Sequence, residues 1–166
     1  YTERMDSSSL RQVVHEQQEE IVRFRALSLV ERDRGKDLLR VLDKPWIKVI
    51  TGIRRCGKSY LAHLALKDRI YGYLNFDDER LSGLRVSDLQ LVYETVLQLQ
   101  GPQPLRFLLL DEVQEVKGWE KWVNRLCEME GLKIFVTGSN AQLLSGEMAT
   151  SLTGRHLTLP LRPFSF

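Results

Sequence analysis

Residues 52–59 read Gly52-Ile53-Arg54-Arg55-Cys56-Gly57-Lys58-Ser59, and the expected fold class follows from this segment. Its glycines let the backbone turn tightly and approach a ligand closely, so that successive N–H groups point inward as an anion-binding nest. A helix that begins near Gly57 adds the positive end of its dipole. Because a lysine ammonium and a serine hydroxyl follow, we expect Lys58 to contact the β- and γ-phosphates of a nucleotide and Ser59 to ligate Mg²⁺.

The sequence on both sides of this loop has the pattern that a phosphate loop requires. Trp46 to Thr51 is a short β-rich run that follows Pro45, and Ser59 to Arg69 has the composition of a helix. A strand before the loop and a helix after it argue against a chance match. The residues expected to contact the phosphates are Gly52, Ile53, Arg54, Arg55, Cys56, Gly57, Lys58, Ser59 and Tyr60.

Two interpretations stay open for the arginines of the loop. Arg54 and Arg55 occupy variable positions of the motif, where solvent-facing side chains are common. Alternatively, one of them contacts phosphate or a neighbouring subunit, since guanidinium groups bind phosphate oxygens well.

A second motif follows an apolar run downstream. Arg106 to Leu110 has the length of a buried strand and is followed directly by Asp111 and Glu112. Carboxylates at the carboxyl end of a parallel strand lie at the crevice where open α/β sheets bind ligands. We therefore expect Asp111 to hold the Mg²⁺ shell through water and Glu112 to orient or deprotonate the attacking water. The alternative is a solvated turn.

A third apolar run, Leu132 to Thr137, is followed by Gly138, Ser139 and Asn140. A polar side chain here could reach the γ-phosphate or the lytic water, and Asn140, Ser139 and Thr137 are all candidates. Ser139 and Asn140 are also favoured helix N-caps, so a purely structural role stays open.

Helices and strands alternate along the rest of the chain. Apart from the segments above, strands are expected at 70–76 and 156–159, and helices at 86–100, 119–129 and 140–150. Continuous apolar runs suit strands that are covered on both faces, so the pattern predicts an α/β fold with a largely parallel sheet. Residues 9–34 have mostly helical spacing, and 38–42 predicts a further short helical piece. We therefore divide the chain into an N-terminal helical lead-in, 1–44, and a core, 45–166.

Composition excludes several classes of protein. The 166 residues are the size of one domain, and 43% hydrophobic with 28% charged residues suit a soluble globular chain. No apolar run approaches a membrane span, and no signal-peptide core is present at the start. Cys56 and Cys127 fit no metal-ligand spacing, so we expect a reduced, cytoplasmic protein with no membrane partner. A net charge of +2 leaves nucleic-acid binding undetermined.

Four segments taken together resemble one family. They are GIRRCGKS at 52–59, LLLDEVQ at 108–114, FVTGSN at 135–140, and LTGR…LPLRPFSF between 152 and 166. They are similar to the prokaryotic AAA-type ATPases of the additional-strand, catalytic-glutamate P-loop class. The resemblance covers roughly residues 40–166, and members normally continue into a C-terminal domain, so 45–166 is expected to be a C-terminally truncated core.

The resemblance implies a three-layer P-loop NTPase fold with a five-stranded parallel sheet of order 5-1-4-3-2. It implies Lys58 and Ser59 as the phosphate and Mg²⁺ contacts, Asp111 as the metal carboxylate and Glu112 as the catalytic glutamate. It places Asn140 or its neighbours at the sensor position. Arg155 becomes a candidate arginine finger, in cis or across a self-association or partner interface, against the alternative of a plain surface arginine.

The expected activity is ATP hydrolysis with Mg²⁺, coupled to motion of a missing domain or a partner. The alternative is a nucleotide-binding switch with little turnover. A small-molecule kinase is disfavoured because no acceptor pocket or lid is found, and a GTPase is disfavoured because no Asn-Lys-x-Asp segment is present. Asp78 in the acidic stretch 77–79 is expected in a solvated loop, with a role near Mg²⁺ as the alternative. Trp119 and Trp122 share a helix face and are expected in the core.

Overall fold

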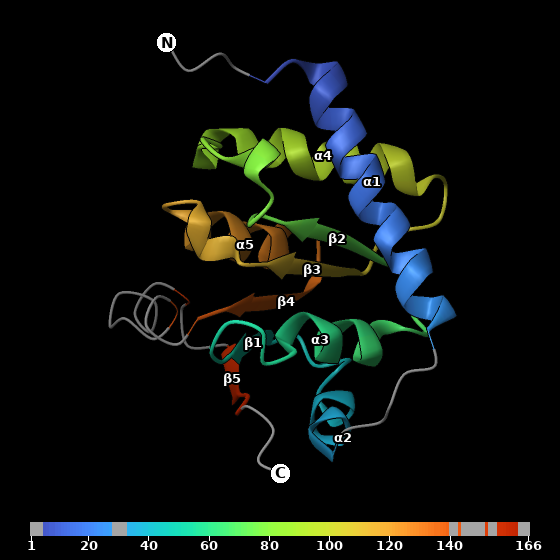
Figure 1. Ribbon diagram of the computed structural model, residues 1–166, viewed down its shortest axis with the longest axis vertical. Coiled ribbons are helices and arrows are strands. Elements are labelled where there is room, and N and C mark those ends of the chain that lie inside the picture. Colours follow the sequence, from blue (N-terminus) through green and yellow to red (C-terminus); the bar gives the residue numbers. More distant parts are fainter. Residues whose placement is uncertain (1–4, 28–32, 140–142, 144–151, 153–155, 163–166) are drawn as a thin grey trace.

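The computed structural model describes residues 5–27, 33–139, 143, 152 and 156–162. In chain order the helices and strands are α1 (Ser7–Ala26), α2 (Asp33–Arg40), β1 (Ile47–Thr51), α3 (Lys58–Leu66), β2 (Tyr71–Asn75), α4 (Leu89–Gln100), β3 (Phe107–Asp111), α5 (Trp119–Met129), β4 (Lys133–Gly138) and β5 (His156–Pro160). Strands and helices thus alternate through the core, as the sequence predicts (Figure 1).

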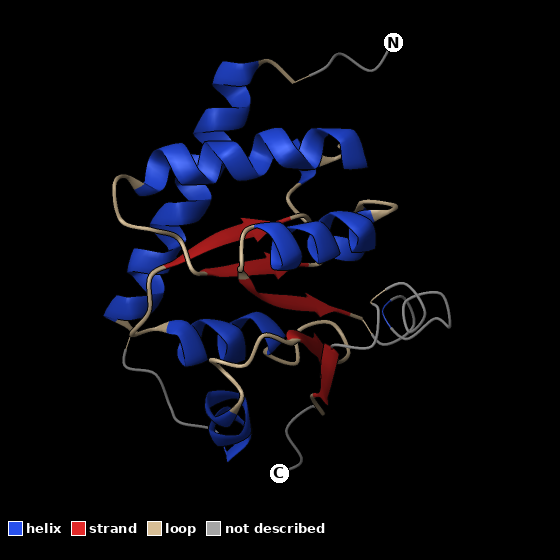
Figure 2. Ribbon diagram, turned by 180° about the vertical axis from the view of Figure 1, so that it is seen from behind, coloured by secondary structure: helices blue, strands red, loops and turns tan. Residues whose placement is uncertain are grey.

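All five strands are parallel and lie in the order β2-β3-β4-β1-β5. This is the predicted order 5-1-4-3-2 read from the other edge, so the predicted fold is confirmed. Helices cover both faces of the sheet, with α2 and α3 on one side and α4 and α5 on the other, which makes three layers (Figures 1 and 2). Because the strands are parallel, the carboxyl ends of β1, β3 and β4 meet at one edge of the molecule.

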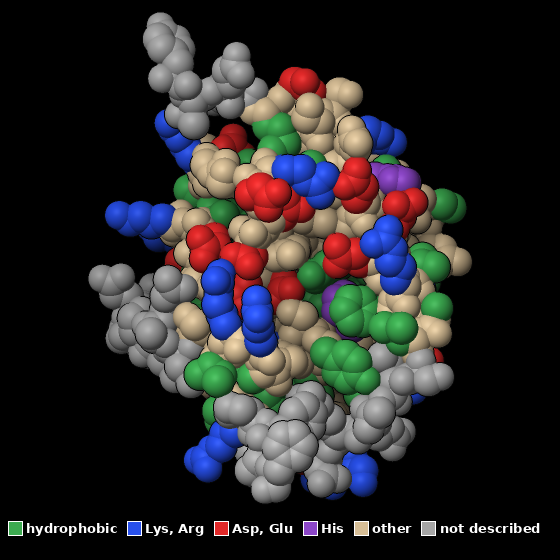
Figure 3. Space-filling view, viewed as in Figure 1, with side chains coloured by type: hydrophobic (Ala, Val, Ile, Leu, Met, Phe, Trp, Pro, Cys, Tyr) green, Lys and Arg blue, Asp and Glu red, His purple; other side chains and the backbone are tan. Residues whose placement is uncertain are grey.

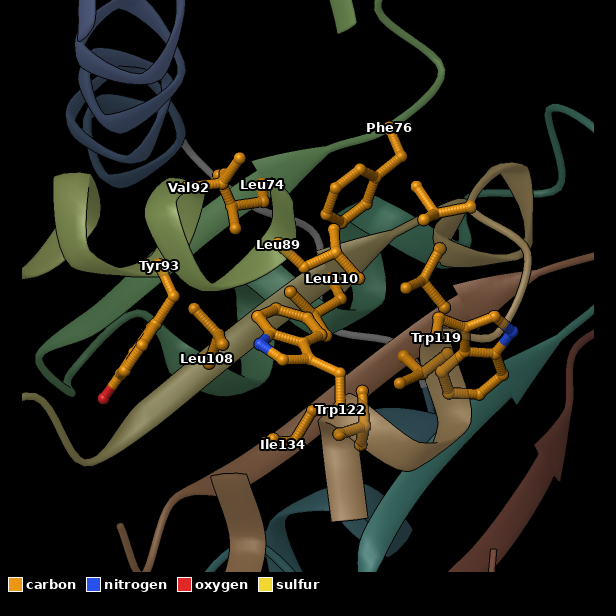
Figure 4. Close-up of a cluster of buried hydrophobic side chains, with 14 of the residues drawn as sticks. Leu74, Phe76, Leu89, Val92, Tyr93, Leu108, Leu110, Trp119, Trp122 and Ile134 are labelled. Carbon is orange, nitrogen blue, oxygen red and sulfur yellow. The ribbon is translucent and has the colours of Figure 1, made fainter. Parts of the chain in front are cut away.

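The core lies on both faces of the sheet, because successive side chains of a strand point to opposite sides. In β3, Leu108 and Leu110 pack with α4 and α5, whereas Phe107 and Leu109 pack with α3. Figure 4 shows the first of these clusters, in which Trp119 and Trp122 lie against strand side chains. Both tryptophans are buried, which confirms their expected place in the core.

Two helices differ in extent from the expectation. The segment 9–34 does not form one helix, because α1 ends at Ala26. Helix α2 begins at Asp33 and ends at Arg40, so it includes the first part of the short helix expected at 38–42. Leu38 and Leu42 are buried together against α3, which explains why a second element forms there. Residues 86–88 form a 3₁₀ turn before α4, and the helix expected at 140–150 lies outside the described residues.

Helix α1 crosses the edge of the sheet at β2 (Figure 1). The buried residues of its first half pack with the hydrophobic cluster between the sheet and α4. Ile21 packs with the hydrophobic cluster between the sheet and α3. Gln17 donates from Nε2 to the Asn75 carbonyl and accepts the Asn75 N–H at Oε1, both at 3.1 Å. Gln18 makes the same pair of bonds to the Tyr73 backbone, at 2.6 and 2.9 Å. The two amide side chains therefore satisfy edge-strand groups that would otherwise lack a neighbouring strand.

We expect replacement of Gln17 by leucine to lower the free energy of unfolding by about 2 kcal/mol. Gln17 is only 2% exposed, so the change leaves a donor and an acceptor of Asn75 without partners. Chemical denaturation, with the midpoint and slope both fitted, measures the loss. Gln12 of the same helix is exposed and bonds only to Glu16; its replacement by leucine should change stability by less than about 0.5 kcal/mol. Equal effects of the two substitutions would contradict the edge-capping role.

Candidate active site

The loop between β1 and α3 has the backbone geometry that its glycines permit. Gly57 precedes α3 with φ 87°, and Arg55 also has a positive φ of 63°. A Cβ atom on Gly52 would lie 2.6 Å from both the Cys56 Sγ and the Leu161 carbonyl oxygen. A side chain cannot fit there, so Gly52 allows the loop to lie tightly against the chain that follows β5.

Lys58 is enclosed by this loop, with a side chain 4% exposed. Its ammonium donates to the carbonyl oxygens of Gly52 and Ile53 at 3.0 Å each. It also lies 3.7 Å from Oε1 of Glu112. The loop thus holds a buried cation beside the carboxylate that follows β3.

Asp111 is the last residue of β3, and three hydroxyl groups donate to its carboxylate. Ser59 Oγ at 2.6 Å and Tyr73 Oη at 3.0 Å both donate to Oδ2. Thr137, on β4, donates from Oγ1 to Oδ1. Burial raises the pKa of Tyr73 far above its ordinary value, so its phenol stays a hydrogen-bond donor. Four elements thereby converge on one buried carboxylate.

Glu112 follows directly, in a left-handed backbone conformation with φ 53°. Its N–H donates to Thr137 Oγ1 at 3.2 Å, and Gln114 Nε2 donates to its Oε2 at 2.5 Å. A side chain on Gly138 would collide with Oε1 of Gln114. The turn after β3 therefore bends the chain so that Glu112 faces Lys58, with Gln114 filling the space beside β4.

The structure brings the two predicted motifs together. The hydrogen bond between Ser59 and Asp111 joins the phosphate loop to the end of β3, so the two motifs lie on the same side of the molecule. Within the loop, Cys56 is buried, Tyr60 is half-buried and Ile53 is exposed. Asn140 and Arg155 lie outside the described residues, so their expected roles stay predictions.

The acidic stretch after β2 is tied down by ion pairs. Arg54 of the loop lies 3.0 Å from Asp77, and both side chains are largely exposed. Asp78 accepts from Arg80 and from Gln17 of α1, which engages the carboxylate away from the loop. Figure 3 shows acidic and basic side chains beside one another on this face of the molecule. Asp77, Glu79 and Arg80 are exposed, as expected of a solvated loop, whereas the side chain of Asp78 is 15% exposed.

The oxygen atoms at this site fit a magnesium ion. A serine hydroxyl and a carboxylate 2.6 Å apart are hard oxygen donors of the kind that Mg²⁺ prefers. Across the part of the chain that the structure describes, no group of three or more His, Cys, Asp or Glu side chains could hold a metal ion by itself. Mg²⁺ usually keeps water and substrate phosphates among its ligands and is bound by one or two carboxylates, so the hydroxyl of Ser59 and the carboxylate of Asp111 fit this ion.

A parallel sheet in this order, a phosphate loop after β1 and a carboxylate at the end of β3 define a P-loop ATPase domain of the AAA type. The family model of the AAA domain matches residues 44–166, and the chain belongs to that family.

Curated relatives come from an archaeon and a bacterium. The uncharacterized protein MJ1544 of Methanocaldococcus jannaschii is 40% identical over 123 residues, which are 72% of this chain and 27% of that protein. An uncharacterized protein of Haemophilus influenzae is 36% identical over 140 residues, which are 79% of this chain and 34% of that protein. The chain thus spans about a quarter to a third of the length of these relatives.

Solved structures share the fold at low sequence identity. The Walker-type ATPase PABY2304 of Pyrococcus abyssi has a TM-score of 0.53 at 17% identity, covering 82% of this chain and 54% of its own. Hsp104, in a closed state with ATPγS and casein, has a TM-score of 0.59 at 17% identity, and the match covers 92% of this chain and 30% of that one.

No helix among the described residues is long and apolar enough to span a bilayer.

Proposed function

We propose that this chain binds ATP together with Mg²⁺ and hydrolyses the γ-phosphate. The observation that carries the proposal is the 2.6 Å contact between Ser59 Oγ and Asp111 Oδ2. It joins the loop suited to phosphate with the carboxylates suited to the metal and the water. Membership of the AAA domain family supports the same reaction.

Each residue then has a defined task. The N–H groups of 52–59 surround the phosphates, and the ammonium of Lys58 leaves the carbonyls of Gly52 and Ile53 to bind phosphate oxygens. Ser59 would ligate Mg²⁺ directly, and Asp111 would hold it through water. When bound, the ion neutralises charge that develops on the phosphate oxygens.

Glu112 is proposed to act on the attacking water. Its side chain is 16% exposed, so one oxygen can accept a proton from water that reaches the site. Gln114 donates to the other oxygen and keeps the carboxylate turned toward the loop. The chain's contribution is thus mainly positioning and charge complementarity, which dominate phosphoryl transfer.

The wider role is proposed on the same basis. Residues 1–44 serve as a helical lead-in and 45–166 as the ATPase core, in which nucleotide turnover drives a conformational change in a further domain or partner. Asn140 would sense the γ-phosphate, and Arg155 would act as an arginine finger at an interface. We place the chain in the cytoplasm, since two cysteines far apart in the sequence suit a reducing compartment.

A nucleotide switch with little turnover is the second candidate. It is favoured by the contacts of Glu112, whose two oxygens lie against Gln114 and Lys58. A glutamate held in this way activates water only after those contacts loosen.

Release of inorganic phosphate from ATP separates the two candidates. With Mg²⁺ present we expect steady phosphate release that stops on addition of excess EDTA. Binding of a fluorescent ATP analogue is measured on the same sample. Binding without phosphate release above the spontaneous rate would favour the switch, whereas failure to bind would overturn both candidates.

A further inference from the structure

Tyr73 lies on β2, two positions before Asn75, which pairs with Asp111 in the sheet. Neither the sequence motifs nor the proposed function uses this residue. We propose that Tyr73 is a positioning residue for the magnesium site, because its hydroxyl holds the Oδ2 atom of Asp111 in place. This inference rests on the proposed assignment of Asp111 to Mg²⁺.

The hydrogen bonds around Asp111 show why one tyrosine matters. The carboxylate is 5% exposed, and Oδ2 accepts from both Ser59 and Tyr73, whereas Oδ1 accepts from Thr137. The Ser59 hydroxyl could ligate a cation through an oxygen lone pair and still donate its proton to Asp111, so its position would depend on the metal as well as on the carboxylate. The Tyr73 hydroxyl is bonded to Asp111 and has no proposed contact with the metal, so its bond acts on the carboxylate alone.

The phenol is also held rigidly, as a positioning role requires. Gln18 of α1 bonds to both the N–H and the carbonyl of Tyr73, which fixes the strand at this position. The ring packs edge-on against His63, with centroids 4.6 Å apart. Its hydroxyl therefore approaches Asp111 from a fixed direction, and each carboxylate oxygen keeps one hydroxyl donor when the metal is bound.

The chain contains a matched control for this role. Tyr71 lies on the same strand and the same face, and it is also buried. Its hydroxyl bonds to His63 Nδ1 at 2.7 Å and not to Asp111. Burial lowers the pKa of His63 to about 3, so the imidazole stays neutral and this bond carries no charge to the metal site. Loss of either hydroxyl costs one buried hydrogen bond, but only the loss at position 73 touches Asp111.

The test measures the Mg²⁺ dependence of binding of a fluorescent ATP analogue to the parent chain, Tyr73→Phe and Tyr71→Phe. The midpoint is the Mg²⁺ concentration that gives half the gain in affinity over EDTA. We expect Tyr73→Phe to raise this midpoint about tenfold, within the range typical of residues that orient metal ligands. Its affinity in EDTA should match the parent, and Tyr71→Phe should leave the midpoint unchanged. Thermal unfolding of both variants checks that they are folded.

The results for Tyr73→Phe, Tyr71→Phe and Asp111→Asn together test the positioning role and the metal assignment. An unchanged midpoint in Tyr73→Phe, or an equal rise in Tyr71→Phe, overturns the positioning role. Asp111→Asn tests the assignment beneath it and should remove most of the gain that Mg²⁺ gives. If Asp111→Asn loses that gain while Tyr73→Phe behaves as the parent, only the role of Tyr73 is wrong. If Asp111→Asn keeps the full gain, the metal assignment in the proposed function is wrong as well.

Discussion

Replacement of Lys58 by alanine is expected to weaken ATP binding by about a hundredfold or more. Lys58 is the buried cation of the phosphate loop, and its ammonium bonds only to two loop carbonyls and lies near Glu112. Truncating one partner of an enclosed charge pair typically costs 2–5 kcal/mol, and each 1.4 kcal/mol is a factor of ten in the dissociation constant. Titration of a fluorescent ATP analogue measures the change.

Two controls make this result specific. Lys67 follows α3 and is exposed, so its replacement by alanine removes the same charge from the opposite end of the helix without touching the loop. Lys67→Ala should bind ATP within about twofold of the parent, since exposed charges contribute little. Circular dichroism should show Lys58→Ala folded. A folded Lys58→Ala that binds ATP as tightly as the parent would remove the phosphate loop from the proposal.

Replacement of Glu112 by glutamine should lower the rate of phosphate release by a factor of about 10² to 10⁴. Glutamine has nearly the same shape, but its amide is a far weaker base, so the attacking water loses its proton acceptor. Binding should change little, because Glu112 makes no contact that holds phosphate. Phosphate release and analogue binding, measured side by side, give the two quantities.

Glu115 supplies the comparison for this second substitution. It lies three residues further along the same turn and is exposed. Glu115→Gln removes an equal charge nearby and should turn over at the parent rate. If Glu112→Gln also hydrolyses ATP at the parent rate, the water-activating group lies elsewhere in the chain.

The site was largely predictable where a motif has a fixed spacing. Gly52, Lys58 and Ser59 are set by the geometry of phosphate binding, and Asp111 by the rule that ligands bind at the carboxyl ends of parallel strands. Both predictions depend on the local chain and on one topological rule. The contact between Ser59 and Asp111 shows that the two predicted segments meet in the folded chain, whereas their roles toward nucleotide and metal stay predictions.

Other contacts could not be predicted because the order of the strands alone does not decide which side chains meet. Tyr73 reads as an ordinary apolar strand residue, and its bond to Asp111 follows only from the pairing of β2 with β3. The pair between Arg54 and Asp77 likewise joins two loops that meet only in the folded chain. The signal available beforehand was weak: two tyrosines, Tyr71 and Tyr73, lie in a strand expected beside that of Asp111, and nothing in the sequence tells which of them reaches it.

The amides of Gln17 and Gln18 have one more consequence, for how copies of this protein meet one another. An unprotected outer strand invites another polypeptide to extend the sheet, which is a route to aggregation and fibril growth. Here the outward backbone groups of Tyr73 and Asn75 are already occupied by a helix of the same chain. A variant that lacks this helix should therefore precipitate when the protein is concentrated, even if enough of the core remains for the rest of the chain to fold.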